Sequence, residues 1–292
     1  MLLNKVYFGD TMKLSKNVPD DYVDLLITSP PYADTLSYGK KIRLLHPDNY
    51  AEWFLPLAKE AARFLKPSGS FILNINDKII NGKRSIYVFE LICRIEKETG
   101  LSLHDRYVWT QKSGLPTGGP RRLDDKVEYI FHFCRKKKRA RGEGYTQQNE
   151  HFKSNIDEVR EPYSVVSINR YKTPVGVNDG VEDSGIVKPG RKTVDANSKG
   201  KIPNTIFDFN NCGALRGKPQ NQHPAPYHPD LPRWFVKWLT DEGDVVLDPF
   251  MGSGTTAGVC QEMGRKWLGF ELNEAYSTLQ SDVLAAANYL SP

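Results

Sequence analysis

The feature that most constrains the fold is a stretch near the C-terminus in which a strand, a glycine turn and a helix start follow one another. Residues 244–248 form a short apolar strand, and the turn after them contains Gly252 and Gly254. The two glycines let the backbone come close to a ligand, and the helix that starts near Thr255 offers unpaired N–H groups. Such a unit predicts an α/β protein that binds its ligand at the carboxyl ends of parallel strands.

Alternating strand and helix patterns extend this interpretation to both ends of the chain. Two strands flank a Gly/Pro-rich loop, Gly114 to Arg122, and we expect them to pair as a hairpin. We expect strands at 22–28, 70–75, 106–110, 127–133, 244–248 and 266–271, helices at 49–66, 87–98, 232–239 and 254–263, and a last helix closing near Ser291. This order predicts a largely parallel, doubly wound α/β sheet.

Two acidic residues narrow down the ligand of the glycine turn. Asp248 ends the first strand and Glu271 ends the next. A carboxylate in the second position suits ribose hydroxyls, which a nicotinamide dinucleotide would also offer. Asp248, however, would repel a pyrophosphate and suits an ammonium group. S-adenosylmethionine carries an ammonium and a sulfonium and has no phosphate, so the pattern favours it. The predicted cofactor-binding residues of this half are Asp248, Pro249, Phe250, Gly252, Ser253, Gly254, Thr255 and Glu271.

A second turn, near the N-terminus, has the chemistry of a site that holds a planar amine. Thr28 ends a strand, and Ser29, Pro30, Pro31 and Tyr32 follow it. The consecutive prolines stiffen the turn and set Pro30 in an extended conformation, which fixes its carbonyl as an acceptor beside the Ser29 hydroxyl. Tyr32 adds an aromatic face. Acceptors and a stacking ring are what the exocyclic amino group of a flipped-out base requires.

Together the two turns resemble those of a known family. Thr28-Ser29-Pro30-Pro31-Tyr32 and Asp248-Pro249-Phe250-Met251-Gly252-Ser253-Gly254-Thr255-Thr256 resemble motifs of the DNA methyltransferases that modify the N4 of cytosine or the N6 of adenine. The catalytic motif comes first and the glycine turn last, an order that resembles the circularly permuted beta class. The resemblance covers about 1–134 and 204–292. It implies a Rossmann-like, S-adenosylmethionine-dependent methyltransferase sheet with an inserted target-recognition region.

The resemblance also implies roles for single residues. It places Asp248 on the methionine ammonium, Phe250 against the cofactor and Glu271 on the ribose. Asp10 matches the acid that meets the cofactor's adenine amino group, and His223 lies in a motif that resembles the one closing over the methionine end. The predicted catalytic residues are Ser29, Pro30, Pro31 and Tyr32, while Asp10, Thr28 and His223 join the cofactor-binding set.

These residues indicate a direct methyl transfer. An exocyclic amine is a poor nucleophile because its lone pair is delocalised, and hydrogen bonds to Ser29 and the Pro30 carbonyl would aim that pair at the methyl group. None of the four cysteines follows a proline, as the nucleophile of a carbon-5 cytosine enzyme would, and this excludes that chemistry. Serine at position 29 resembles the N4-cytosine members, so we expect methylation at N4 of cytosine, with N6 of adenine as the alternative.

The positive charge is concentrated in one segment. From Arg135 to Lys201 there are 15 Lys and Arg against 9 Asp and Glu, in a chain whose formal net charge is +5. Alone, such a run is typical of a solvated loop, but beside a base-holding turn it favours duplex DNA as a partner. We expect a catalytic half, 1–134, an inserted basic target-recognition region, 135–203, and a cofactor-binding half, 204–292. The predicted DNA contacts are Lys112, Arg121, Arg122, Arg135, Lys136, Lys137, Lys138, Arg139 and Arg141.

Composition and the remaining patterns exclude several classes. No apolar run reaches the roughly 18 residues of a membrane helix, which predicts a protein without a membrane segment. Charges at Lys5 and Asp10 argue against a signal peptide, and we expect a cytoplasmic protein. Scattered cysteines predict neither disulfides nor a metal site. A DNA-binding protein without activity would have no use for both turns, while a methyltransferase acting on RNA or on protein amines stays an alternative. The family implies a cognate restriction endonuclease as a partner, and the sequence leaves the oligomeric state open.

Overall fold

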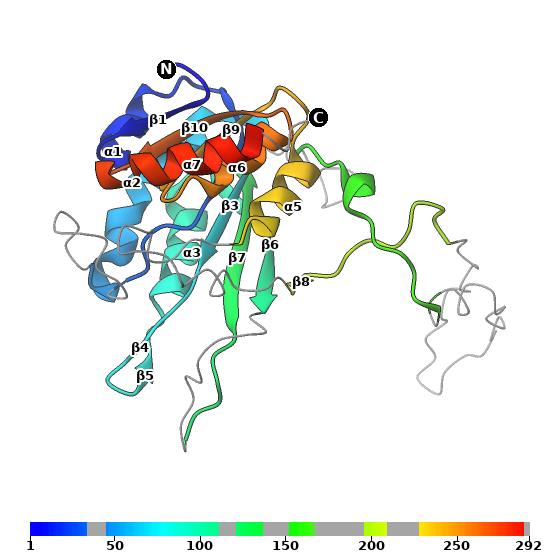
Figure 1. Cartoon of the computed structure of the whole chain (residues 1–292). Helices are drawn as coiled ribbons and strands as arrows, with labels where there is room; N and C mark the ends of the chain where they lie inside the picture. The colour runs from blue at the N-terminus through cyan, green and yellow to red at the C-terminus, as the bar shows by residue number, and fades with distance from the viewer. Residues whose placement is uncertain are drawn as a thin grey trace, which may run out of the picture. The chain divides into compact units, whose positions relative to one another are not determined.

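The computed structural model describes residues 1–33, 45–110, 121–136, 152–165, 167, 196–208 and 228–288. Contacts divide the chain into two units, one made of Met1–Asn155 with Thr205–Pro292 and the other of Ile156–Asn204. The larger unit holds the sheet and the helices that position the candidate site (Figure 1).

An eight-stranded sheet runs through the larger unit, in the order β1-β10-β9-β2-β3-β7-β6-β8. Its strands are β1 (Lys5–Phe8), β2 (Val23–Thr28), β3 (Leu65–Ile75), β6 (Leu101–Thr110), β7 (Val127–Arg135), β8 (Ile206–Phe207), β9 (Val245–Asp248) and β10 (Lys266–Glu271). The strands from β1 to β3 in that order are parallel, and β7 runs antiparallel to both β3 and β6. The predicted, largely parallel α/β sheet is confirmed, and so is the β6–β7 hairpin.

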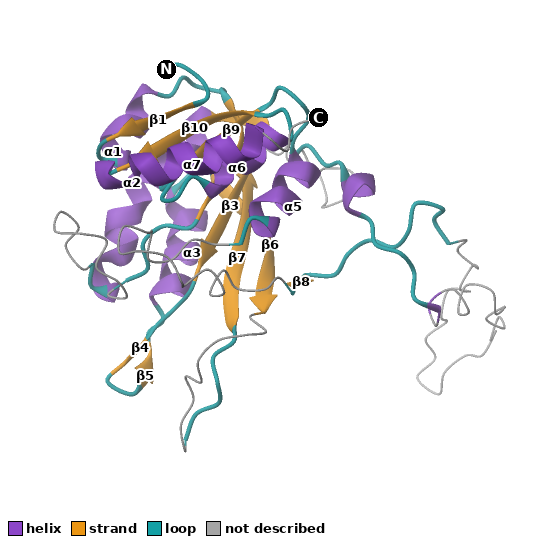
Figure 2. Cartoon of the chain, viewed as in Figure 1, coloured by secondary structure: helices purple, strands orange, loops and turns teal. Residues whose placement is uncertain are grey.

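Helices lie on both sides of this sheet (Figure 2). They are α1 (Thr11–Leu14), α2 (Tyr50–Phe64), α3 (Tyr87–Glu98), α5 (Asp230–Leu239), α6 (Thr255–Glu262) and α7 (Ser277–Asn288). In Figure 1, α6 and α7 lie in front of the strands, and α2 and α3 lie behind them. A doubly wound arrangement follows, because the parallel strands are covered on both faces.

Several element boundaries differ from the prediction. The helix expected at 49–66 ends at Phe64, since Leu65 is already extended and opens β3, which is five residues longer at its start than expected. The helix α2 begins at Tyr50, directly after a 3-10 turn at Pro47–Asn49, and contains Pro56. The strand expected at 106–110 begins at Leu101, where it pairs with Arg135.

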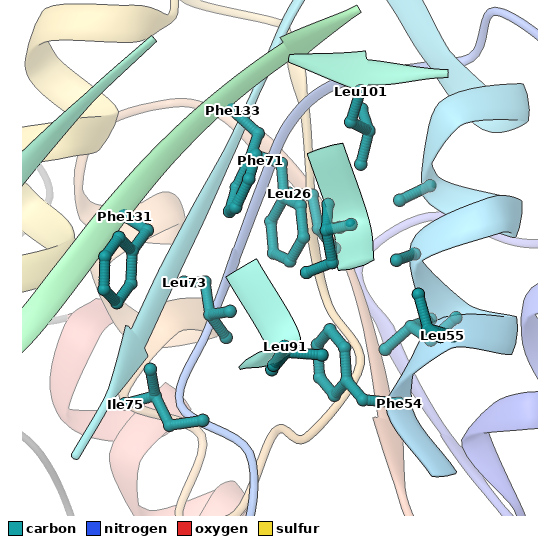
Figure 3. Close-up of a cluster of buried hydrophobic side chains, with 14 of the residues drawn as sticks. Leu26, Phe54, Leu55, Phe71, Leu73, Ile75, Leu91, Leu101, Phe131 and Phe133 are labelled. Atoms are coloured by element: carbon teal, nitrogen blue, oxygen red, sulfur yellow. The ribbon is translucent and has the colours of Figure 1, made fainter. Parts of the chain in front are cut away.

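The core lies between the sheet and the helices α2 and α3 (Figure 3). All six residues of β2 are buried, as expected for a parallel strand covered on both faces. Phe54 of α2 stacks on Phe71 of β3, which in turn stacks on Phe133 of β7. Each fully buried Leu or Phe contributes about 1.5–3 kcal/mol. This packing fixes the carboxyl ends of β2 and β3 relative to each other.

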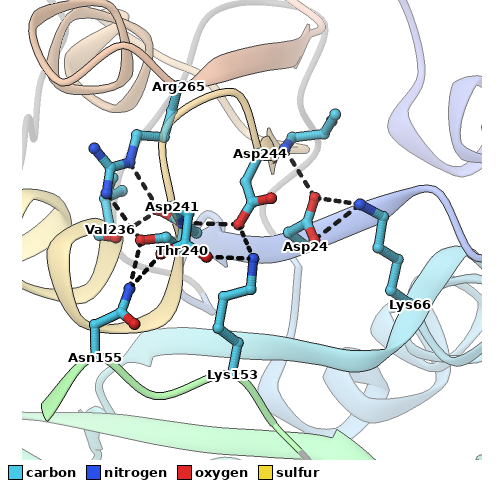
Figure 4. A network of polar contacts seen from close by, with 10 residues as sticks. Asp24, Lys66, Lys153, Asn155, Val236, Thr240, Asp241, Asp244 and Arg265 are labelled. Carbon is cyan, nitrogen blue, oxygen red and sulfur yellow. Dashed lines mark hydrogen bonds and ion pairs between the residues drawn. The ribbon is translucent and has the colours of Figure 1, made fainter.

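A polar network joins residues 152–155 to the rest of the larger unit (Figure 4). The Lys153 ammonium lies 2.5 Å from the Asp244 carboxylate and 2.9 Å from that of Asp241. The Asn155 amide donates to the Thr240 carbonyl, and the Phe152 ring packs on Trp238. The contacts therefore place the start of the second unit at Ile156, inside the 135–203 region that we predicted as the insertion.

The smaller unit, Ile156–Asn204, is held by its own ion pairs. Asp157 binds both Arg160 and Lys199, and Lys201 pairs with Glu161. The backbones of Glu161 and Lys201 also form an antiparallel bridge. Three basic residues of this segment thus already contact carboxylates.

Across the described part of the chain, none of the helices combines the length and apolar character needed to cross a lipid bilayer.

Candidate active site

The predicted site residues follow the ends of parallel strands that share one edge of the sheet. Phe8 of β1 is in register with Glu271 of β10, and Thr28 of β2 with Leu73 of β3. Because carboxyl ends of parallel strands meet at the same edge, the residues after β1, β2, β3, β9 and β10 lie along it. We call this the carboxyl edge.

The glycine turn at this edge has the backbone that its sequence predicts. Gly252 and Gly254 have φ values of 52° and 89°, a left-handed conformation that a side chain would strain. Gly254 is the N-cap of α6, and the Ser253 and Thr255 hydroxyls lie 3.0 Å apart. The backbone of the turn is held from the side, because the Thr11 hydroxyl donates to the Pro249 carbonyl.

Asp248 joins the two predicted turns. Its carboxylate is completely buried and accepts hydrogen bonds from the Thr28 hydroxyl at 2.8 Å and the Thr256 hydroxyl at 2.6 Å. The Phe250 N–H donates to it as well, at 3.1 Å. One side chain thus connects the end of β2, which carries the Ser-Pro-Pro-Tyr turn, to the turn after β9. Direct contact between Asp248 and a ligand ammonium stays a prediction.

Glu271 organises the neighbouring part of the edge. Its two oxygens accept from the Gly252 and Asn273 N–H groups, each at 2.8 Å. Burial raises the pKa of Glu271 above the usual glutamate value, although these backbone donors oppose the shift. Asp10 lies two residues beyond the Phe8–Glu271 pair, is exposed, and caps α1 by accepting from the Met12 N–H.

The Phe250 ring lies in an aromatic group on the α2 side of the turn. Its centroid is 5.7 Å from that of Trp53 and 6.5 Å from that of Phe54. Phe250 is only partly buried. It therefore keeps an accessible surface beside the turn, as a residue that packs against a cofactor would require.

The Ser-Pro-Pro-Tyr turn is built into a cluster of four polar side chains. Tyr32 donates its hydroxyl proton to Glu128 of β7 at 2.6 Å, and the Ser29 hydroxyl lies 3.3 Å from that of Tyr32. The Asn74 amide nitrogen of β3 lies within 3.3 Å of Ser29, 3.0 Å of Tyr32 and 3.1 Å of Glu128. Tyr50 donates to the Pro31 carbonyl at 2.8 Å, which fixes the turn on α2. Ser29, Tyr32, Asn74 and Glu128 are called the serine–tyrosine cluster below.

Two properties of this cluster bear on its chemistry. Burial, reinforced by the Glu128 carboxylate, raises the pKa of Tyr32 well above its usual value, so the phenol stays protonated and donates. The Asn74 carbonyl oxygen is buried and finds no hydrogen-bond partner within the described residues. An unpaired buried acceptor costs about 1–3 kcal/mol, and it suits a ligand with N–H groups.

Asn74 and Glu128 were not predicted from the sequence. The sequence pattern places Asn74 in the strand 70–75 and Glu128 in the strand 127–133, without marking either as a site residue. A polar residue near the carboxyl end of an apolar run, as Asn74 is in Phe71-Ile72-Leu73-Asn74-Ile75, is the signal that could have identified it.

The predicted DNA contacts separate into two places. Arg121 and Arg122 are exposed, and Arg122 donates to the Gly82 carbonyl at 2.8 Å. Arg135 instead bonds the Asp21 carboxylate and the Leu65 carbonyl, and Lys136 bonds the carbonyls of Glu96 and Thr99. Asp21 and Leu65 lie at the amino ends of β2 and β3, and Glu96 and Thr99 lie just before the amino end of β6, all opposite the carboxyl edge. Contact of any of them with DNA stays a prediction. His223, Lys112, Lys137, Lys138, Arg139 and Arg141 lie outside the described residues.

No trio or larger group of His, Cys, Asp and Glu in the described ranges is arranged to hold a metal ion. The hydrogen-bonding groups at the carboxyl edge are carboxylate acceptors, hydroxyls and backbone N–H donors around a glycine turn. Two acidic side chains, Asp248 and Glu271, disfavour a phosphate there and suit a cationic, ribose-bearing ligand. The residues present therefore fit S-adenosylmethionine.

Comparison with known proteins agrees with this geometry. The family model for N6- and N4-modifying enzymes, described as DNA methylase, matches residues 23–281. The type II methyltransferase M.PvuII of Proteus hauseri is 30% identical over 93% of this chain and 80% of its own length. The DNA adenine methyltransferase YhdJ of Escherichia coli is 24% identical over 98% of this chain and 84% of its own.

Solved structures show the same fold. PvuII DNA methyltransferase, described as cytosine-N4-specific, matches with a TM-score of 0.65 and 24% identity, covering 98% of this chain and 92% of the other. TTHA0409 of Thermus thermophilus, solved in complex with S-adenosyl-L-methionine, matches with a TM-score of 0.57 and 20% identity, covering 97% of this chain and 95% of the other.

Proposed function

Because this chain belongs to the family of DNA methylases that modify amino groups at N6 or N4, we propose that it transfers a methyl group from S-adenosyl-L-methionine to the N4 of cytosine in duplex DNA. The observation that carries the proposal is the Thr28–Asp248–Thr256 connection. These hydrogen bonds join the end of β2, which precedes the Ser-Pro-Pro-Tyr turn, to the glycine turn, and this supports a site in which the methyl donor and the amine meet at the carboxyl edge.

The glycine turn and its neighbours would hold the cofactor, which supplies an electrophilic methyl group on its sulfonium. Gly252 and Gly254 leave room for its close approach, and Phe250 offers a partly exposed ring. Glu271 would accept from ribose hydroxyls and Asp10 from the adenine amino group. TTHA0409, which has the same fold, binds S-adenosyl-L-methionine in its crystals. We assign the Asp248 carboxylate to the methionine ammonium on the basis of charge.

The serine–tyrosine cluster would hold the base. The Ser29 hydroxyl and the Pro30 carbonyl would accept from the amino group and favour a pyramidal nitrogen, while the Tyr32 ring would stack on the base. Glu128 and Asn74 fix the Tyr32 and Ser29 hydroxyls. Orientation and electrostatics then supply the rate enhancement, without a covalent enzyme intermediate.

The choice of N4 rests on Ser29 and on resemblance. Relatives of this chain carry both specificities, since PvuII DNA methyltransferase is described as cytosine-N4-specific and YhdJ as an adenine methyltransferase. Both bases offer an amino group beside a ring-nitrogen acceptor, so the hydrogen-bonding argument applies to each. Methylation at N6 of adenine is the second candidate.

Product analysis tests the proposal. The protein is incubated with S-adenosylmethionine and unmethylated genomic DNA, and the digested nucleosides are identified by mass spectrometry. N4-methylcytosine is the expected product. N6-methyladenine would keep the mechanism and refute the role given to Ser29. If neither product forms although the protein binds the cofactor, duplex DNA is refuted as the substrate. Methylation of RNA in a parallel reaction would then identify RNA as the substrate.

The relatives suggest a wider context. Type II methyltransferases such as M.PvuII are the modification half of restriction–modification systems, and we propose the same role, with an endonuclease of equal sequence specificity as the partner. The insertion, 135–203, would read the DNA sequence. Among its described residues, Asp157 pairs with Arg160 and Lys199, and Glu161 pairs with Lys201. Digestion of methylated plasmid by candidate endonucleases would show which cleavage the product blocks.

A further inference from the structure

A small β-hairpin projects from the carboxyl end of β3. It consists of β4 (Ile79–Ile80) and β5 (Lys83–Arg84), which pair antiparallel and stand away from the sheet (Figure 1). Asn81 and Gly82 form its two-residue turn, with φ values of 49° and 77°. In tight two-residue hairpin turns, a left-handed backbone at both central residues gives the turn a twist that matches the twist of its strands. The hairpin is therefore a defined projection.

The base of the hairpin is fixed to the end of the sheet. Arg84 bonds Asp77, whose side chain is fully buried, and donates to Asp125 at 2.8 Å. The Asn76 amide donates to the Val127 carbonyl at 3.0 Å. The segment 121–126 is also attached to the hairpin turn, because Arg122 donates to the Gly82 carbonyl. Residues 77–85 and 121–126 are called the bracket below.

The bracket has an excess of basic residues, several of which are exposed. It contains six Lys and Arg residues, namely Lys78, Lys83, Arg84, Arg121, Arg122 and Lys126, against the three acids Asp77, Asp124 and Asp125. Arg84 pairs with two of these acids. Lys83, Arg121 and Arg122 are all exposed, and the bond of Arg122 to a carbonyl leaves its positive charge in place.

The bracket begins next to the serine–tyrosine cluster, whereas Arg135 lies at the other end of β7. Asp77 is three residues beyond Asn74, and three extended residues span at most about 10 Å. Arg135 is seven residues from Glu128 along β7, which corresponds to about 24 Å at the rise of an antiparallel strand. The bracket therefore extends outward from the carboxyl edge, where a base held at Ser29 would lie, whereas Arg135 lies at the opposite edge of the sheet.

We propose that the bracket clamps the DNA backbone next to the extruded base, with Lys83, Arg121 and Arg122 neutralising phosphates. This inference rests on the proposed function, because it presupposes a nucleic-acid substrate at the serine–tyrosine cluster. It assigns the hairpin of β4 and β5 a role that the sequence did not suggest. In this proposal the bracket holds the DNA strand that carries the extruded base, and the insertion, 135–203, recognises the DNA sequence.

The salt dependence of DNA binding tests the proposal. A fluorescent duplex carrying the sequence methylated by the wild type is titrated with the intact protein from 50 to 200 mM salt. Lys83→Ala/Arg121→Ala removes two phosphate contacts and should lower the slope of log affinity against log salt by about 1.8. The affinity loss should then be about 12-fold larger at 50 mM than at 200 mM salt. Arg84 is left intact because it pairs with the buried Asp77.

Two further variants make the result specific. Lys59→Ala/Lys97→Ala removes two exposed lysines, near the C-terminal ends of α2 and α3, and should keep the wild-type slope. Lys83→Arg/Arg121→Lys keeps both charges and should also keep it. A wild-type slope for the Lys83/Arg121 alanine variant, or an equal loss in the Lys59/Lys97 control, would overturn the inference. A wild type that transfers no methyl group to duplex DNA would instead refute the proposed function.

Discussion

Replacing Glu128 by glutamine should slow methyl transfer about 5- to 12-fold while leaving cofactor affinity unchanged. The Glu128 carboxylate accepts from the Tyr32 hydroxyl at 2.6 Å and lies 3.1 Å from the Asn74 amide nitrogen. Hydrogen bonds to a charged group contribute about 1.5–3 kcal/mol and neutral ones about 0.5–1.5 kcal/mol. The exchange therefore weakens the positioning of Tyr32 by about 1–1.5 kcal/mol, which corresponds to the stated rate ratio.

Single-turnover methyl transfer at saturating DNA and cofactor measures this effect separately from binding. A double-mutant cycle adds Tyr32→Phe, which removes the hydroxyl and keeps the ring. If Glu128 acts through Tyr32, the double variant should be no slower than the worse single variant, with a coupling energy of about 1–1.5 kcal/mol. Glu242→Gln, an exposed glutamate in the loop before β9, is the matched control and should transfer at the wild-type rate.

Additive effects in this cycle, within about 0.5 kcal/mol, would refute the reasoning, because they would mean that Glu128 and Tyr32 act independently. A fall in thermal stability that matches the fall in rate would do so as well, since it would assign Glu128 a purely structural role. A pH profile that keeps its shape in Glu128→Gln, with only the height reduced, is the expected signature of positioning.

Three further results are expected. Glu271→Gln should weaken cofactor binding about 5- to 12-fold in calorimetric titration, because the charged acceptor is lost, and an unchanged Kd would contradict the role of Glu271. Thr28→Val should lower the free energy of unfolding by about 1–3 kcal/mol in urea, since Asp248 loses a buried donor; a smaller loss than in an exposed Thr→Val control would contradict it. Burial lowers the pKa of His132 well below its usual value. Below about pH 6.5 the unfolded state therefore binds a proton at this histidine that the folded state does not bind. The free energy of unfolding should then fall by about 1.4 kcal/mol per pH unit as the pH is lowered further. His132→Gln should flatten that fall between pH 6.5 and 5.5.

Much of the site could be predicted because its chemistry is local. The two turns are continuous stretches of sequence, and the parallel strands that precede them bring Ser29 and Asp248 to the same edge. The Thr28–Asp248 bond joins residues 220 positions apart, but strand order alone makes it accessible to prediction. Gly252 and Gly254 adopt the left-handed backbone that their place in the turn requires.

The parts that could not be predicted depend on long-range register. Asn74 and Glu128 meet because β7 runs antiparallel beside β3 in a register that pairs Asn74 with Ile130, two positions from Glu128. A hydrophobic pattern identifies both strands without giving that register. The same direction of β7 carries Arg135 to the far edge, where it bonds Asp21 rather than facing the catalytic turn. The start of the second unit likewise depends on contacts of Lys153 that its own sequence neighbourhood does not indicate.

The central claim is that Ser29 and the glycine turn act on one substrate pair, with Ser29 serving the base and not the cofactor. The most direct test is the single-turnover methyl-transfer rate of Ser29→Ala at saturating DNA and S-adenosylmethionine. Loss of one group that stabilises the transition state costs about 10²- to 10³-fold, so the account predicts a rate at least about 100-fold below the wild type, with unchanged cofactor affinity. Transfer at the wild-type rate would contradict it.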